Sequence, residues 1–285
     1  MKKDKIKSYC KINLTLKINR KLKNGFHSIS SLITFCKLHD EICISRINGT
    51  KDRIVFSGKF KKGIKKNENT VAKLLLLLRK KKFIKKQSFK INIKKNIPHG
   101  SGLGGGSSNA AVLLNYFNKK MKLKLKKNNI FKIARKIGFD VPISLEKRNT
   151  FLLRNKILRI NKKFNLNLLI VYPNVICSTK KIYNKHKIES SPKNRYYFNL
   201  QNNKKLPSYL KNQKNDLQST AINIYPKIGK IINFIKSQKG CFFSRITGSG
   251  SACIGIFSNK SNTIFAQKII KSRYPKYWCV VSKTI

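Results

Sequence analysis

The chain has 285 residues, with 65 lysines and arginines against nine aspartates and glutamates, which gives a formal net charge of +56. This length allows one large domain or two modest ones, each with a real core. A basic excess of this size is typical of nucleic-acid-binding proteins. The lysines are spread along the whole chain, however, and do not form one stripe with interleaved aromatic residues. We therefore interpret most of the charge as solvated surface, and nucleic-acid binding is the alternative.

The seven cysteines are scattered and include no CxxC pair or other metal-site spacing, which predicts reduced thiols in a cytoplasmic protein. The N-terminus is not followed by a signal-peptide apolar core. The apolar run in "VAKLLLLLRKKK" is too short to span a bilayer. We therefore expect no membrane association, and we expect a monomer or a weak dimer.

The first hundred residues predict strands and one helix. The helix, residues 69–78, has Asn69 or Thr70 as its cap. Segments with strand patterns are 9–18, 39–47, 52–58 and 88–97.

A glycine-rich loop follows, and then two helices. The first has apolar residues at 110, 113, 114 and 117, and the second has an apolar face from Ile130 to Ile137 and ends at Gly138. Pro142 prevents a simple continuation of the second helix. Beyond residue 150 the pattern predicts strands at 150–155 and 166–173, a helix at 224–238, a strand–loop–strand at 241–257, a helix and a last strand at 278–283. This order predicts an α+β fold with domains at 1–150 and 151–285.

The loop itself has five glycines between Gly100 and Gly106, directly before a helix. Glycine lets a ligand approach the backbone closely, and a helix N-terminus offers free N–H groups and a positive dipole end. Both features predict a phosphate site. A Walker A loop would need Gly-Lys-Ser/Thr, a dinucleotide fold would need an acidic residue about twenty positions on, and a protein kinase would need HRD and DFG segments. None of these is present.

Asp140 lies in the tight segment "GFDVP" and is one of the nine acidic residues. An aspartate in this place can simply form a turn. Acidic residues are so scarce in this chain that we favour a catalytic role.

The segment "PHGSGLGGGSSNAA" resembles the phosphate loop of the GHMP kinases. Four further segments resemble the members of that family that act on 4-diphosphocytidyl-2-C-methyl-D-erythritol: "SYCKINLTLKI", "NGFHSISSLI", "IGFDVPISL" and "RITGSGSACIGIF". The matches run in order from residue 9 to about residue 257. The resemblance implies a two-lobed GHMP kinase fold, with an N-terminal ATP-binding lobe similar to a ribosomal protein and a ferredoxin-like C-terminal lobe. The implied activity is phosphorylation of the 2-hydroxyl of that cytidyl compound by ATP, which gives the 2-phosphate and ADP in non-mevalonate isoprenoid biosynthesis.

The resemblance also assigns roles to residues. Asp140 is expected to be the catalytic base, with Lys11 beside it to keep the carboxylate ionised and polarise the hydroxyl. Mg²⁺ is expected with ATP, and Ser107 or Ser108 could reach it, although the sequence does not decide between them. The nucleotide phosphates are expected to bind to Pro98, His99, Gly100, Ser101, Gly102, Leu103, Gly104, Gly105, Gly106, Ser107 and Ser108.

The expected substrate site contains a place for a cytosine ring. Phe26 and Tyr183 are expected to stack on its two faces, and His27 is expected to hydrogen-bond its polar edge. Lys180 stands where the family has proline, so this wall departs from the family pattern. Other expected substrate residues are Asn13, Thr179, Gly248, Ser249 and Gly250.

Two alternatives remain open. One is a GHMP kinase for another small alcohol, and the other is a basic nucleic-acid-binding α+β protein. Residues 184–215 have no role that the sequence can assign.

Overall fold

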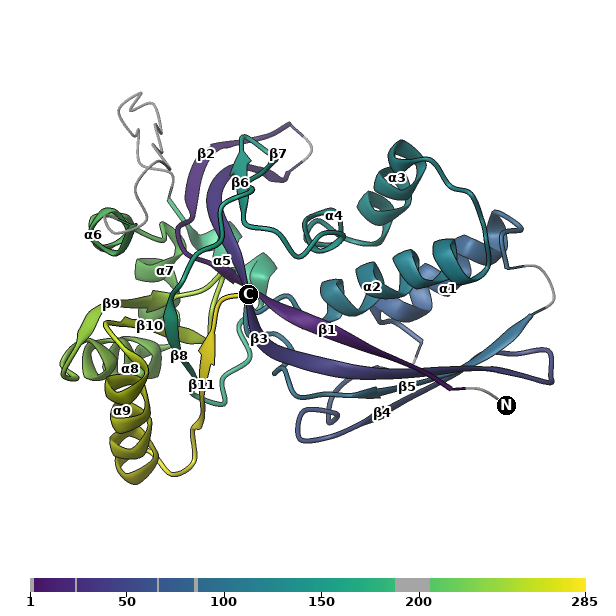
Figure 1. The fold of residues 1–285 in the computed structure, drawn as a ribbon. Helices are drawn as coiled ribbons and strands as arrows, with labels where there is room; N and C mark the ends of the chain where they lie inside the picture. Colours follow the sequence, from purple (N-terminus) through teal and green to yellow (C-terminus); the bar gives the residue numbers. More distant parts are fainter. Residues whose placement is uncertain (1–2, 24, 66, 85–86, 188–205) are drawn as a thin grey trace. The chain divides into compact units, whose positions relative to one another are not determined.

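The computed structural model describes residues 3–23, 25–65, 67–84, 87–187 and 206–285 (Figure 1). Its contacts divide the chain into two compact units. Unit 1 contains residues 1–11, 38–99 and 104–147, and unit 2 contains residues 12–37, 100–103 and 148–285. The chain passes from one unit to the other within the glycine-rich loop and within the long strand β3 (His27–Ile47). The predicted domain boundary near residue 150 stays a prediction.

Unit 1 is built on β1 (Asp4–Asn13) up to Lys11, the second half of β3, β4 (Arg53–Ser57) and β5 (Ser88–Lys94). Strand β5 pairs antiparallel with β3, with Glu41 opposite Lys94, and parallel with β4, with Arg53 opposite Lys90. Parallel neighbours need a crossover connection, which is provided here by α1 (Thr70–Lys80). The other helices are α2 (Gly105–Lys120), α3 (Lys127–Ile137) and the short α4 (Val141–Ser144).

The core of unit 1 lies between these strands and helices, and Figure 1 shows α1, α2 and α3 on one side of β3, β4 and β5. The predicted cap of α1 is confirmed, because the Asn69 side chain accepts hydrogen bonds from the amides of Val71 and Ala72. The buried apolar side chains of this core include Ile42, Ile44, Val71, Leu74, Leu78, Phe89, Ile91, Ile93, Leu113, Leu114 and Phe117.

Unit 2 contains a four-stranded sheet in the order β11-β8-β10-β9, in which every neighbouring pair is antiparallel. Its strands are β8 (Asn167–Tyr172), β9 (Cys241–Ile246), β10 (Cys253–Phe257) and β11 (Trp278–Lys283). Helix α8 (Pro226–Lys236) packs on β9 and β10, and α9 (Lys260–Arg273) packs on β8 and β11.

The rest of unit 2 includes β2 (Lys17–Lys21), the first half of β3, β6 (Thr150–Leu153) and β7 (Lys156–Arg159). Strand β3 pairs antiparallel with both β2 and β6. The described part of this unit also contains three short helices: α5 (Thr179–Lys185), α6 (Leu206–Lys211) and α7 (Leu217–Ile224).

Two predicted strands differ from the structure. Residues 9–18 were predicted as one strand, but they form the end of β1 and the start of β2, because the Leu14 amide turns to the carbonyl of Leu32 and the Leu16 amide to that of Lys214. Strand β3 begins at His27, well before the predicted start at residue 39. Its first half carries Ser28, Ser30 and Ser31, whose polarity hides the strand pattern although all three are buried.

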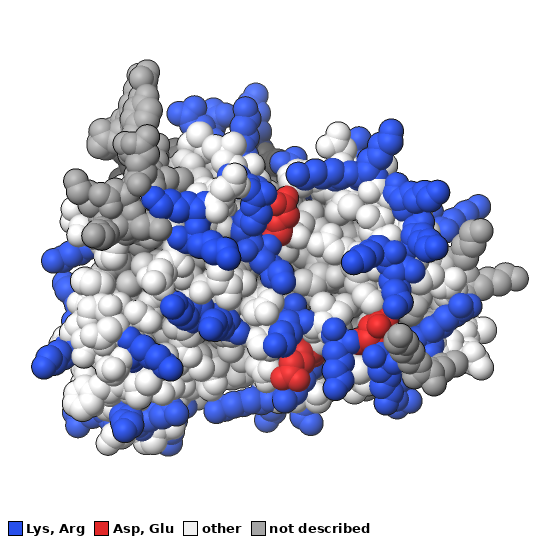
Figure 2. All heavy atoms as spheres, viewed as in Figure 1, with Lys and Arg blue, Asp and Glu red and all other residues white. Residues whose placement is uncertain are grey.

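Charged side chains are scattered over the face drawn in Figure 2, where Lys and Arg do not gather into one stripe. Among the residues that the structure describes, no helix is both long enough and apolar enough to cross a membrane. Much of the unassigned stretch 184–215, namely residues 188–205, lies outside the described residues.

Candidate active site

Lys11 and Asp140 form an ion pair in unit 1, with 3.1 Å between Nζ of Lys11 and Oδ2 of Asp140. The Lys11 side chain, on β1, is 4% exposed, whereas that of Asp140 is 30% exposed. Helix α3 ends before Gly138 and α4 starts after Asp140, with Pro142 in its first turn. The Asp140 carboxylate makes no cap bond to α4. One side of this carboxylate therefore contacts a buried ammonium group while the other side stays open to a ligand.

The second half of the glycine-rich loop, residues 104–108, packs on Lys11. A Cβ atom at Gly104 would lie 2.9 Å from Cγ of Lys11, and Gly104 has φ +67°, so a side chain is excluded for two reasons. Gly104 is also the N-cap of α2, and no side chain in the described part of the chain caps this helix. The first helical bond runs from the Ser108 amide to the Gly104 carbonyl, at 2.9 Å. The amides of residues 105–107 therefore lie outside the helical ladder, where they can donate to phosphate oxygens.

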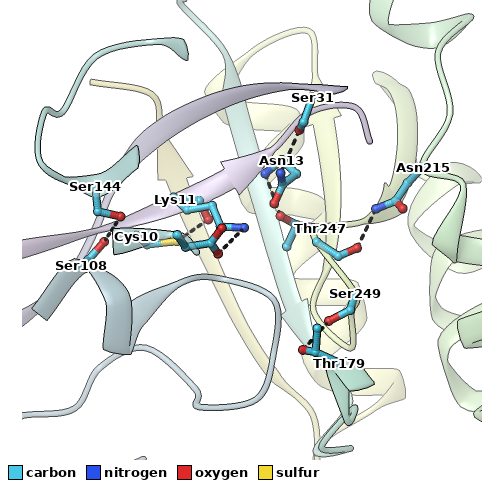
Figure 3. Close-up of polar contacts among 12 residues, drawn as sticks. Cys10, Lys11, Asn13, Ser31, Ser108, Ser144, Thr179, Asn215, Thr247 and Ser249 are labelled. Atoms are coloured by element: carbon cyan, nitrogen blue, oxygen red, sulfur yellow. Dashed lines mark hydrogen bonds and ion pairs between the residues drawn. The ribbon is translucent and has the colours of Figure 1, made fainter. Parts of the chain in front are cut away.

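The two serines at the end of the loop, Ser107 and Ser108, differ in their surroundings. The Ser108 side chain is buried and its hydroxyl donates to Oγ of Ser144, at 3.3 Å (Figure 3). Ser107 is half-buried. In the described part of the chain, no cluster of three or more His, Cys, Asp or Glu side chains could hold a metal ion. Asp140 and Ser107 each carry an oxygen of the type that Mg²⁺ takes as a ligand, and this ion is usually bound largely through nucleotide phosphates and water.

The entry to the glycine-rich loop rests on a buried ion pair that sequence reasoning missed. The Lys95 ammonium pairs with Oδ2 of Asp40, and the other oxygen, Oδ1, accepts from the amides of Asn96 and Ile97 at 2.8 and 2.9 Å. Both charged side chains are almost fully buried. A Cβ atom at Gly105 would lie 3.3 Å from Nζ of Lys95, so this ammonium lies directly under the start of α2.

Pro98 leads into the loop, and His99 is tied to the segment after β4. Nε2 of His99 lies 2.8 Å from the carbonyl oxygen of Lys62. His99 therefore contacts a neighbouring loop of unit 1 through its side chain.

The two glycine segments of the sequence lie against each other in unit 2. A Cβ atom at Gly102 would clash with the carbonyl oxygen of Thr247, and one at Gly248 would lie 3.1 Å from the carbonyl oxygen of Gly102. The Ala252 amide also donates to the Ser101 carbonyl, at 3.0 Å. The loop Thr247–Gly250 thus supports residues 100–103 of the first loop.

Polar contacts join the predicted substrate residues of unit 2 to this second loop (Figure 3). The Asn13 amide donates to Oγ1 of Thr247 at 2.8 Å, and the Asn13 side chain donates to Oγ of Ser31 at 2.8 Å. The hydroxyls of Thr179 and Ser249 lie 3.0 Å apart. Thr179 is the first residue of α5, the helix that carries Tyr183, so α5 is tied to the second loop.

The three predicted base-binding residues all belong to unit 2. The rings of His27 and Tyr183 are in contact, with centroids 5.1 Å apart and planes tilted by 39°, so no base fits between these two rings. Phe26 is 66% exposed. Burial, together with the charges of Lys21 and His186, lowers the pKa of His27 below its usual value. A neutral imidazole results at pH 7, and it offers one donor and one acceptor.

Asn215 is a second contributor that sequence reasoning missed. Its side-chain nitrogen donates to the carbonyls of Ile246 and Gly248, at 3.1 and 2.8 Å. No local signal marks it, because it stands in a polar stretch and its partners lie about thirty residues away.

Comparison with known proteins gives matches over most of the chain. Residues 69–148 match the model of the GHMP kinases N terminal domain, and residues 198–276 match the model of the GHMP kinases C terminal domain. The chain is 41% identical over 283 residues to 4-diphosphocytidyl-2-C-methyl-D-erythritol kinase of Pelagibacter ubique, which covers 99% of each chain. It is 31% identical over 272 residues to the protein of the same name from Caldicellulosiruptor bescii, which covers 94% of each.

Solved structures show the same fold. A crystal structure of 4-(cytidine 5'-diphospho)-2C-methyl-D-erythritol kinase superposes with a TM-score of 0.79 at 21% identity, covering 98% of this chain and 99% of that one. Homoserine kinase from Cytophaga hutchinsonii superposes with a TM-score of 0.73 at 16% identity, covering 100% of this chain and 95% of that one. These likenesses confirm the predicted α+β fold class. The two family models match the chain in the order N-terminal domain and then C-terminal domain, and the relatives match it over nearly its whole length. The chain therefore belongs to the GHMP kinase family.

Proposed function

We propose that this chain transfers the γ-phosphoryl group of ATP to the 2-hydroxyl of 4-diphosphocytidyl-2-C-methyl-D-erythritol, which gives the 2-phosphate and ADP. The observation that carries the chemistry is the Lys11–Asp140 ion pair, in which Lys11 packs against Gly104 in the second half of the phosphate loop. The choice of substrate follows the name of the relative that is 41% identical over 99% of the chain.

Asp140 is the proposed base. Its carboxylate accepts the proton of the 2-hydroxyl while the hydroxyl oxygen attacks the γ-phosphorus, and the bond to the β–γ bridging oxygen breaks to release ADP. Lys11 holds this carboxylate in place through the ion pair, with 3.1 Å between Nζ of Lys11 and Oδ2 of Asp140. Such a transfer depends mainly on positioning and on charge stabilisation.

The phosphates of ATP are proposed to lie on the glycine-rich loop. The amides of residues 105–107 and the positive end of α2 stabilise the charge on the phosphate oxygens. Mg²⁺, when bound, neutralises charge on the β- and γ-phosphates. Ser107 is the better candidate for its hydroxyl ligand, because the Ser108 hydroxyl is buried and bonded to Ser144.

The cytosine ring is proposed to stack between Phe26 and Tyr183, with the neutral His27 at its polar edge. The contact between His27 and Tyr183 supports this, since it leaves the exposed Phe26 as the second stacking surface. Phe26, His27, Tyr183 and the second glycine loop belong to one unit, which is proposed to hold the substrate. The reaction is proposed to take place in the cytoplasm, as one step of non-mevalonate isoprenoid biosynthesis.

A coupled assay for ADP release tests this function with a panel of alcohols. Purified protein with Mg-ATP is given the cytidyl compound, the corresponding uridyl compound, homoserine or mevalonate. We expect turnover with the cytidyl compound, weaker turnover with the uridyl compound, and none above background with the other two. Comparable turnover of homoserine or mevalonate would contradict the proposed substrate, and folded protein without any turnover would contradict the proposed activity.

A further inference from the structure

Asn215 uses its whole side-chain amide in bonds to the backbone. Its nitrogen donates to the carbonyls of Ile246 and Gly248, at 3.1 and 2.8 Å, and its oxygen accepts from the Leu217 amide at 3.1 Å. The residue is 5% exposed. Because both donors of a buried amide are engaged, the Gly248 carbonyl is held in one direction.

The segment that carries Asn215 is itself fixed on both sides. The Leu16 amide donates to the Lys214 carbonyl at 3.1 Å, and the Asp216 amide donates to the Leu16 carbonyl at 2.9 Å. On the other side, the Ile246 amide donates to Oε1 of Gln218 at 3.1 Å. The segment 214–218 therefore connects the strand that follows Asn13 with the strand that leads into the second glycine loop.

The contact of Gly248 with the first glycine loop extends this connection to the phosphate site. A Cβ atom at Gly248 would lie 3.1 Å from the carbonyl oxygen and 3.3 Å from Cα of Gly102. With φ values of +58° and +80°, the two glycines meet backbone to backbone, and there is no flexible side chain between them to absorb a shift. A displacement of the Gly248 peptide is therefore passed directly to Gly102.

We propose that Asn215 is a positioning residue for nucleotide binding. It contacts neither ATP nor the phosphoryl acceptor. It acts through the Gly248 peptide, which sets the place of Gly102 and so the direction of the backbone amides in the first half of the phosphate loop. This inference rests on the proposed ATP-dependent kinase function, but it does not depend on which alcohol is phosphorylated.

Two variants of Asn215 test the proposal. Asn215→Ala removes all three hydrogen bonds. Asn215→Ser keeps an acceptor for the Leu217 amide, so that the start of α7 is preserved, but its hydroxyl is too short to reach the Gly248 carbonyl. The matched control is Asn149→Ala, because Asn149 is also 5% exposed in unit 2 and its amide also bonds a backbone carbonyl, that of Lys162 at 2.7 Å.

The first readout is the dissociation constant of ADP in the presence of Mg²⁺, measured by calorimetry on folded protein. We expect about a tenfold weakening for both Asn215 variants and less than a twofold change for Asn149→Ala, even where the control loses as much thermal stability. In steady-state assays the KM for ATP should rise by a similar factor, with a smaller change in kcat.

The proposal is overturned if Asn215→Ser binds ADP as tightly as Asn149→Ala does, and this comparison decides the matter where Asn215→Ala does not fold. It is also overturned if the Asn215 variants lower kcat and leave both the KM for ATP and the ADP affinity unchanged. Failure of the proposed function has a different signature, because the wild-type protein would then bind ADP without phosphorylating the cytidyl compound.

Discussion

The acidic residues of this chain are few, and each one in the described part has a defined partner. Seven of them pair with a lysine or an arginine, and the eighth, Asp216, accepts from the backbone amide of Ile18 at 2.8 Å. Asp140 differs from the buried Asp40 because its side chain is partly open, and it differs from the exposed Glu68 because its partner is buried. Scarcity alone was thus a fair reason to single it out, whereas its partner could not be found among so many lysines without the family resemblance.

Replacing Asp140 should affect the chemical step. We expect Asp140→Asn to lower kcat by about 10²–10⁴-fold, which is the usual contribution of a general base, while the KM for ATP changes little. The matched control is Glu146→Gln. Glu146 lies close to Asp140 in the sequence and pairs with Lys127, so this substitution also removes one negative charge from an ion pair. Steady-state kinetics of both variants check this expectation, and a kcat for Asp140→Asn equal to that of the control would remove Asp140 from the mechanism.

His27 should make substrate binding depend on pH. Its pKa lies below the usual 6.5, because of burial first and of Lys21 and His186 next, so the ring is neutral above pH 6.5 and gains a proton only as the pH falls further. Protonation removes its acceptor. We therefore expect the KM for the cytidyl compound to stay constant down to about pH 6.5 and to rise below it.

The control for this prediction is His27→Gln, which carries no charge at any of these pH values. Its KM for the cytidyl compound should be higher than that of the wild type at neutral pH and should not rise further in acid. An equal rise in acid for both proteins would assign the pH dependence to another group. Because the folded-state pKa of His27 is depressed, the neutral ring also stabilises the fold above pH 6.5, and this contribution is lost as the pH falls through the folded pKa.

At the scale of elements, β5 and the loop that follows it are fixed by two neighbouring ion pairs of different kinds. Lys95 pairs with Asp40 in the core, where both are almost fully buried, and Lys94 pairs with Glu41 at the surface, where both are about half exposed. Asp40→Asn leaves a buried ammonium without a counter-charge, which costs about 3–5 kcal/mol. Glu41→Gln should cost less than about 1 kcal/mol, since exposed pairs contribute little.

Urea denaturation of these two variants measures the difference. An equal loss of unfolding free energy in both variants would show that the Asp40–Lys95 pair contributes no more to stability than a surface ion pair. The comparison is well controlled, because the two acids are adjacent on β3 and the two lysines are adjacent at the end of β5.

The contact between the two glycine loops gives a further prediction. Gly102 and Gly25 have almost the same backbone angle, with φ +80° and +78°, but a Cβ atom would clash with Thr247 at Gly102 and would meet nothing within 4 Å at Gly25. Gly25→Ala should therefore cost only the strain of the angle, about 1–2 kcal/mol. Gly102→Ala should cost more and should also weaken ADP binding, as calorimetry and thermal unfolding would reveal; equal effects of the two substitutions would contradict the close packing of the loops.

Local signals predicted several elements well. Asn69 caps α1, Gly138 follows the end of α3, and the alternation at 88–94 forms β5. The first half of β3 was missed because its buried serines bond partners such as the Asn13 side chain, so these polar residues do not appear on an exposed face. Elements whose hydrogen bonds come from neighbouring residues in the sequence are predictable, whereas elements stabilised by distant partners are not.

At the scale of the whole molecule, the site also has parts that the local sequence predicts and parts that depend on distant residues. The phosphate loop was predictable, since five glycines and the following helix are contiguous in the sequence. The support beneath it was not, because Asp40 holds Asn96 and Ile97 from 56 and 57 residues away, and Asn215 holds Gly248 from 33 residues away. The sequence pattern records only side chains, so hydrogen bonds to distant backbone carbonyls and amides could not be predicted from it.

None of these contacts explains the net charge of +56. The acids in the described part are engaged, and the cationic side chains on the face drawn in Figure 2 are dispersed. On this face the lysines and arginines form no single basic stripe of the kind that a nucleic-acid site would show, and a solvated surface stays our interpretation of the charge.

The central claim is the transfer of a phosphoryl group from ATP to one hydroxyl of the cytidyl compound. Phosphorus NMR of a reaction with Mg-ATP, 4-diphosphocytidyl-2-C-methyl-D-erythritol and the purified protein tests it most directly. The account predicts one new phosphomonoester signal on the erythritol 2-oxygen, formed in equal amount with ADP and formed about 10²–10⁴-fold more slowly when Asp140→Asn replaces the wild type. Unchanged ATP, or ADP formed together with free inorganic phosphate in place of the monoester, would contradict it.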